Sequence, residues 1–144
     1  MQIADILRSK GNTVITISAD LSVAAAIELL VEHSIGALVV QSGGDIVGII
    51  SERDILRLAN HDAARLSTIP ISRVMTRELV VGLPDDDIQY VMEILTRNRI
   101  RHLPIVAEGR LAGIVSIGDV VNAVRNGLEA ENRYLREYVQ GVFA

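Results

Sequence analysis

An internal repeat constrains the fold of this chain more than any other feature of its sequence. Residues 14–58 align without a gap onto residues 79–123, at a constant offset of 65 residues. Many aligned pairs exchange one aliphatic residue for another. The repeat predicts one supersecondary unit used twice, with each copy too small to bury its apolar faces alone. Ten pairs are identical: Asp20/Asp85, Glu28/Glu93, Leu30/Leu95, Ile35/Ile100, Leu38/Leu103, Gly44/Gly109, Gly48/Gly113, Ile49/Ile114, Ser51/Ser116 and Asp54/Asp119.

Each copy opens with a predicted strand and a predicted helix. The strands are expected at Thr13–Ile17 and Glu78–Gly82, because both stretches are short and β-rich. Asp20 and Asp85 are expected to cap the helices that follow. The apolar residues of these helices recur at helical spacing: Val23, Ala26, Ile27, Leu30 and Val31 in the first copy, and Ile88, Val91, Met92 and Leu95 in the second.

Each copy continues with a predicted β-hairpin and a closing helix. The first hairpin joins Ala37–Val40 to Ile46–Ile50 through a Gly-Gly-Asp turn, and the second joins His102–Val106 to Leu111–Val115 through Glu-Gly. The predicted fold is α/β (α+β), with two β-α-β-β-α repeats packed with pseudo-two-fold symmetry. An amphipathic C-terminal helix is expected to follow them.

The same patterns predict the domain boundaries. We expect the first repeat with its lead-in helix at 1–60, a linker at 61–70, the second repeat at 71–125 and the C-terminal helix at 126–144. Short lead-ins at Ile3–Leu7 and Ile71–Met75 are expected to cross over to the other half. The C-terminal helix has an apolar side that needs a partner, which favours a homodimer over packing on its own chain. This side comprises Val124, Leu128, Leu135, Tyr138 and Val142.

Composition excludes several classes of protein. The absence of Cys excludes disulfides, thiolate metal sites and a cysteine nucleophile, and it fits a reducing compartment. No apolar run reaches the length of a membrane span and the N-terminus does not resemble a secretory signal, so a cytoplasmic protein is expected. The net charge of −4 argues against broad binding to nucleic acid.

The most informative local motif is Gly-x-x-Ser-x-x-Asp, present as Gly48–Asp54 and again as Gly113–Asp119. Each copy lies where a strand gives way to a helix. One interpretation is structural, since Ser with an acid three residues later forms a capping box. The other is functional, since a helix N-terminus with a free hydroxyl suits an anion, and a carboxylate accepts hydrogen bonds from a ribose diol. Arg53, Arg99, Arg101 and His102 are candidate cations for a phosphate.

The duplicated motif, with Arg101-His102-Leu103-Pro104-Ile105-Val106 on the second hairpin, resembles a pair of CBS domains, also called a Bateman module. Nearly the whole chain is similar to the short stand-alone bacterial CBS-pair proteins. The resemblance implies regulatory binding of adenosine-containing ligands such as AMP, ADP, ATP, NAD or S-adenosylmethionine in clefts between the repeats. It also implies homodimers and an unidentified regulated protein partner.

The resemblance also implies site residues. Asp54 and Asp119 would hold ribose, and Ser51 and Ser116 would lie near ribose or phosphate. Arg53 is a phosphate candidate that the second copy replaces by Gly118, so the two sites are expected to differ. The ligand-lining hairpin stretches would include Gly36 and Ala37 in the first copy, and Arg101, His102 and Pro104 in the second.

Other functions are less well supported by the sequence. No nucleophile with a supporting base and no cofactor-binding fingerprint is visible, so an enzyme is not expected. His33 and His61 lack ligand-spaced partners, and His102 is expected to be a hydrogen-bonded structural residue, so no metal is expected. Two alternatives to a nucleotide sensor stay open: a constitutive interaction scaffold with empty clefts, and weak binding of RNA or single-stranded DNA through Arg97–His102.

Overall fold

The computed structural model describes residues 1–143, without the side chains of Val142 and Phe143. The chain forms two compact units. The first-repeat unit is Thr13–Val81, and the second-repeat unit combines Met1–Asn12 with Gly82–Ala144. Both units mix helices and strands, as the sequence predicts.

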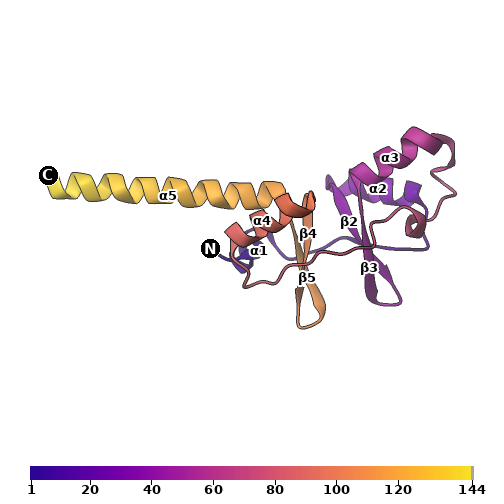
Figure 1. Ribbon diagram of the computed structural model, residues 1–144, viewed down its shortest axis with the longest axis horizontal. Helices are drawn as coiled ribbons and strands as arrows, with labels where there is room; N and C mark the ends of the chain where they lie inside the picture. The colour runs from indigo at the N-terminus through magenta and orange to yellow at the C-terminus, as the bar shows by residue number, and fades with distance from the viewer. Residues whose placement is uncertain (144) are drawn as a thin grey trace. The chain divides into compact units, whose positions relative to one another are not determined.

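The first-repeat unit contains a three-stranded sheet of β1 (Thr16–Ser18), β2 (Ala37–Ser42) and β3 (Asp45–Ser51). β1 runs parallel to β2, and β2 pairs antiparallel with β3. Figure 1 shows α2 (Val23–His33) and α3 (Glu52–Asp62) beside this sheet, and the short helical turns η1 (Ala63–Arg65) and η2 (Ile71–Arg73) follow. Aliphatic side chains fill the core, which includes Ile17, Ala26, Leu30, Leu38, Val40, Ile50, Ile71 and Met75.

The second-repeat unit contains a two-stranded sheet of β4 (His102–Ala107) and β5 (Arg110–Ser116), with α1 (Ile3–Lys10) and α4 (Ile88–Asn98). The strand predicted at Glu78–Gly82 is wrong: it is reduced to one isolated parallel bridge between Gly82 and Ile105. Gly82 lies so close to the sheet that a Cβ there would be 2.8 Å from Leu103 Cδ2. The chain turns at Pro84 directly afterwards, so no strand continues beyond Gly82.

The predicted helix starts need a correction. Neither Asp20 nor Asp85 caps a helix; α2 is capped by Ser22, whose Oγ accepts a hydrogen bond from Ala25 N (3.2 Å), and α4 by Asp87. A cap must immediately precede the first helical turn for its oxygen to reach the free N–H groups. Val31 was predicted on the apolar face of its helix, yet its side chain is 74% exposed.

The two hairpins turn in the same way. Gly43 and Gly44 both have positive φ (59° and 86°), and so do Glu108 and Gly109 (54° and 75°). Two consecutive left-handed residues form the tight turn whose twist matches that of the flanking strands. The second hairpin reaches this geometry with one glycine only.

The lead-in segments cross over, as the sequence predicts. α1 belongs to the second-repeat unit, where Ile3 is fully buried and Ile3 N donates to Asp86 O (3.0 Å). Ile71 of η2 is fully buried in the core of the first-repeat unit. Within residues 61–70, the carbonyls of Leu66 and Ile69 accept hydrogen bonds from the first N–H groups of α2.

The expected C-terminal helix is present and is continuous with the closing helix of the second repeat. This helix, α5 (Ile117–Phe143), extends far beyond the β4–β5 hairpin (Figure 1). The side chains from residue 125 to residue 141 are all exposed. Within the described part of the chain, no helix combines the length and hydropathy that a membrane span requires.

Candidate functional site

In the first-repeat unit, the Ser-x-x-Asp motif closes the N-terminus of α3. Ser51 N donates to Asp54 Oδ2 (3.0 Å), and Asp54 N donates to Ser51 Oγ (3.3 Å). This is a full capping box, so the structural interpretation is correct for these residues. Capping engages mainly Oδ2 of Asp54, and Oδ1 receives a long hydrogen bond of 3.3 Å from Thr76 Oγ1. We call Ser51, Asp54, Thr76 and the adjoining hairpin residues Gly36 and Ala37 the Asp54 site.

The hairpin brings the other predicted residues of this copy to the same helix end. Glu52 N, the first N–H of α3, donates to Gly36 O (3.0 Å), and Ala37 pairs with Ser51 in the β2–β3 ladder. Arg53 is exposed in the first turn of α3. The structure therefore gathers Gly36, Ala37, Ser51 and Asp54 at one helix end, with Arg53 beside them.

The second copy repeats this construction at the N-terminus of α5. Ser116 N donates to Asp119 Oδ2 (2.8 Å), and Asp119 N donates to Ser116 Oγ (3.1 Å). Ile117 N donates to Arg101 O (2.8 Å), which is the counterpart of the Glu52–Gly36 bond. His102 pairs with Ser116 across the β4–β5 ladder, and Pro104 lies two residues further along β4, buried and paired with Ile114.

Lys10, at the end of α1, adds a cation to this second helix end. Its Nζ donates to Asp119 Oδ2 (2.7 Å) and to Ile114 O (2.9 Å). The side chain of Lys10 is 38% exposed and that of Asp119 is 25% exposed. We call Ser116, Asp119, Lys10, Arg101 and His102 the Asp119 site.

The surroundings of Asp119 keep it ionised. Burial would raise the pKa of this carboxyl group, but hydrogen bonds from Lys10 and from Ser116, together with the Lys10 charge, lower the pKa overall. An ionised carboxylate only accepts hydrogen bonds, so both of its oxygens suit donor groups such as sugar hydroxyls.

The glycine of each motif lets a lead-in segment approach the strand closely. A Cβ at Gly48 would lie 2.8 Å from Met75 Sδ and 2.8 Å from Thr76 O. A Cβ at Gly113 would lie 2.7 Å from Leu7 Cδ2. The two glycines thus bring the lead-ins, and with them Thr76 and Lys10, to the motif aspartates.

Thr76 and Lys10 are the site residues that the sequence reasoning missed. The two lead-ins differ in length and secondary structure, because α1 has eight residues and η2 has three. At an offset of 65, Lys10 therefore aligns with Met75 and not with Thr76. The sequence offers only an indirect indication of their roles. Thr76 directly follows Met75, which packs on Gly48, and Lys10 lies three residues after Leu7, which packs on Gly113.

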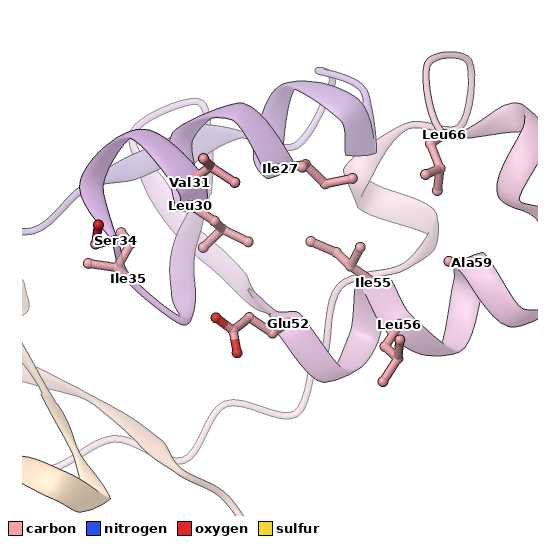
Figure 2. A pocket seen from close by; sticks show the side chains of 10 residues that line it. All are labelled: Ile27, Leu30, Val31, Ser34, Ile35, Glu52, Ile55, Leu56, Ala59 and Leu66. Atoms are coloured by element: carbon pink, nitrogen blue, oxygen red, sulfur yellow. The ribbon is translucent and has the colours of Figure 1, made fainter.

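A separate apolar groove lies between α2 and α3 of the first-repeat unit. Its volume is about 620 Å³. Figure 2 shows Ile27 and Leu30 of α2 on one side of the groove and Ile55 of α3 on the other, with Glu52 near one end. Apart from Glu52, the lining is uncharged. The groove therefore suits an apolar surface better than a nucleotide.

The described residues contain no cluster of three or more His, Cys, Asp or Glu side chains that could hold a metal ion. The two helix ends provide hydroxyl groups, carboxylates, backbone carbonyls and cations. This set supports reversible binding of a ligand that carries hydroxyl groups and anionic groups.

Comparison with known proteins identifies the repeat. The family profile of the CBS domain matches residues 3–61 and 71–126. The CBS domain-containing protein CBSX3 of Arabidopsis thaliana, described as mitochondrial, is 34% identical over 148 residues, which cover 96% of this chain and 72% of the relative.

Solved structures show the same architecture. A CBS-domain-containing protein from Agrobacterium tumefaciens has 39% identity and a TM-score of 0.83, covering 85% of this chain and 98% of its own. The CBS domain pair of protein MJ0100, solved with 5′-methylthioadenosine and S-adenosyl-L-methionine, has 25% identity and a TM-score of 0.78, covering 88% and 98%. The chain therefore belongs to the CBS-domain family and contains two CBS repeats.

Proposed function

We propose that this protein is a non-enzymatic sensor of adenosine-containing ligands, with AMP, ADP, ATP and NAD as the first candidates. The observation that carries the proposal is the repeated helix end. In both units a motif aspartate, a motif serine and a hairpin carbonyl meet at the first turn of a helix. The ligands of the MJ0100 CBS pair contain adenosine, which supports the same ligand class here.

In this proposal each aspartate accepts hydrogen bonds from the ribose hydroxyls. Asp54 and Asp119 are half-buried and fixed by their capping boxes, so little side-chain entropy is lost on binding. The exposed cations Arg53 and Arg101 are the candidates for phosphate contacts, with His102 beside Arg101. Ala37 and Pro104 are buried in β2 and β4, so they offer little exposed surface to the base.

Ligand binding regulates the protein only if the ligand prefers one conformation over another. We propose that occupancy changes the arrangement of the two repeats or of a dimer, and that a partner protein responds to this change. A cytoplasmic location is part of the same proposal.

Calorimetric titration of the full chain with AMP, ATP, NAD and S-adenosylmethionine tests the proposal. Asp54→Asn and Asp119→Asn keep a carbonyl acceptor for the capping box but lose the charge. If the aspartates hold ribose, each change weakens its own site by about ten-fold or more, the usual effect of a lost charged hydrogen bond. Asp45→Asn, in an exposed strand end outside both sites, is the matched control.

Failure of the wild-type chain to bind any of these four ligands would favour the constitutive scaffold. Binding that neither asparagine variant weakens would contradict the ribose assignment alone.

We also propose that the protein is a homodimer and that the α2–α3 groove contacts the second copy. Val31 and Leu56, at its edges, are 74% and 71% exposed. An isologous contact requires one patch to fit itself, and a nearly uncharged patch with apolar residues on both sides meets this requirement.

Sedimentation velocity should show dissociation of the dimer for Val31→Glu and Leu56→Glu. Arg57→Ala, on the same helix outside the groove lining, should stay dimeric.

A further inference from the structure

Lys10 and Thr76 occupy corresponding places in the two units, although they do not align in sequence. Thr76 Oγ1 contacts Asp54, and Thr76 N donates to Ile49 O (2.8 Å). Lys10 Nζ contacts Asp119 and donates to Ile114 O (2.9 Å). Ile49 and Ile114 are an identical pair of the repeat. One ammonium group therefore makes both contacts that the hydroxyl and the backbone N–H of Thr76 make.

This exchange gives the two sites different charge. Asp54 accepts hydrogen bonds from neutral donors, namely the N–H and hydroxyl of Ser51 and the hydroxyl of Thr76. The Asp119 carboxylate is paired with a full positive charge 2.7 Å away. No ion pair involving Asp54 is found among the described residues.

Lys10 leaves part of the Asp119 site available. Lys10 Nζ and Ser116 N both donate to Oδ2 of Asp119, so these two contacts engage a single carboxylate oxygen. An ammonium group has three donors, and two of those of Lys10 are directed to Asp119 and Ile114 O. A carboxylate oxygen for a hydroxyl group thus lies beside a cation with a further donor for an anion.

We propose that Lys10 is a specificity-determining residue that makes the Asp119 site prefer nucleoside phosphates over uncharged nucleosides. This inference rests on the proposed function. A lysine ammonium is a compact point charge that binds phosphate from a flexible stem, so Lys10 contacts the phosphate while Asp119 Oδ1 accepts from the sugar. Thr76, which is neutral, makes no such distinction at the Asp54 site.

The test measures AMP and adenosine binding by calorimetry in the full chain carrying Asp54→Asn, which leaves the Asp119 site intact. Lys10→Met keeps the length of the apolar stem and removes the charge. We expect AMP affinity to fall by about ten-fold or more, as for a lost charge-assisted hydrogen bond, and adenosine affinity by less than about three-fold. Lys10→Arg should restore most of the preference for AMP.

Arg8→Met is the matched control. Arg8 is a cation on the same helix as Lys10, but it pairs with Asp5 and not with a residue of the Asp119 site. Its replacement should leave both affinities within about two-fold, the effect of screened surface charge. Lys10→Gln gives a second neutral variant if Lys10→Met does not fold, as judged by circular dichroism.

The outcomes separate this inference from the proposed function. Equal losses for AMP and adenosine would mean that Lys10 only positions α1, and tighter binding of both would mean that Lys10 competes with the ligand; either result overturns the inference. Binding by the wild-type chain but not by Asp54→Asn overturns the inference alone. No binding by the wild-type chain overturns the proposed function and this inference with it.

Discussion

The two units use one motif but stabilise it from different lead-in segments. In the first-repeat unit, the backbone of Thr76 pairs with Ile49 as an isolated β-bridge, and Met75 covers Gly48. In the second-repeat unit, α1 packs a side chain, Leu7, over Gly113, and Lys10 reaches Asp119. The lead-in of the first-repeat unit thus contacts its strand through backbone and side chain, and the other lead-in contacts its strand through side chains. The two units therefore share the motif, but their lead-ins differ in the charge that they place beside the motif aspartate and in how much room they leave at the motif glycine.

The largest expected effect comes from removing the buried isoleucine of one lead-in. Ile71 is fully buried, so Ile71→Ala should destabilise the first-repeat unit by about 2–5 kcal/mol, through lost transfer free energy and the cavity left behind. Hydrogen exchange should show lost protection in β2 and β3. Ile3→Ala should cause a similar loss in β4 and β5. Equal loss of protection in both hairpins for Ile71→Ala would contradict its assignment to the first-repeat unit.

The motif glycines should differ in their tolerance to alanine. At Gly48 the new Cβ would meet a backbone atom, Thr76 O, at 2.8 Å, so the Ile49–Thr76 bridge must shift. At Gly113 the new Cβ would meet only the end of the Leu7 side chain. We expect Gly48→Ala to lose about 1–3 kcal/mol in urea unfolding, the usual effect of overpacking, and Gly113→Ala to lose less. A larger loss at Gly113 would show that Leu7 cannot rearrange.

The sequence predicts what the repeat shares and misses what distinguishes its copies. The hairpins, the capping boxes and the close approach at Gly48 follow from residues that are identical in both copies. The helix caps Ser22 and Asp87 occupy equivalent positions but are different residues, so identity between the copies does not reveal them. The identical pair Asp20/Asp85 predicts the caps at the wrong positions. A comparison at a fixed offset finds positions at which the two copies have the same residue. It does not find positions at which different residues have the same structural role.

The contacts of Lys10 and Thr76 depend on tertiary structure. Lys10 lies 109 residues from Asp119, and Thr76 lies 22 residues from Asp54. No local pattern reports such a pairing, since it depends on the length of a lead-in and on how it packs. The sequence therefore offers Asp119 as a candidate site residue, but it does not predict that Lys10 pairs with this carboxylate.

The pH dependence of stability should distinguish the two aspartates through Lys10. The pKa of Asp119 in the folded chain lies below its ordinary value of 3.8, so the Lys10–Asp119 bond contributes stability above that pH and loses it as the pH falls through the folded pKa. Lys10→Met should be less stable than wild type at pH 7 by about 1 kcal/mol or less, because the pair is partly exposed. In urea titrations this difference should shrink as the pH falls below 3.8 and disappear once the pH is below the folded pKa of Asp119.

Thr76→Val is the matched change in the first-repeat unit, since it removes the hydroxyl donor from Asp54 without removing a charge. A loss of stability for Lys10→Met that stayed constant from pH 7 to pH 3 would show that packing of the lysine stem, not its charge, is responsible.

The smallest expected effect concerns the last difference between the units, the length of their closing helices. α3 ends after 11 residues, whereas α5 has 27, and its side chains from residue 125 to residue 141 are exposed. Ending the chain after Gly127 keeps a residue suited to a helix C-terminus, and the removed side chains that the structure describes, at residues 128–141, are all exposed. At concentrations low enough to prevent association, urea unfolding should change by less than about 0.5 kcal/mol, as for exposed surface. A loss above about 1 kcal/mol would show that the distal helix packs against its own chain, whereas a loss confined to high concentration would assign its apolar side to a second copy.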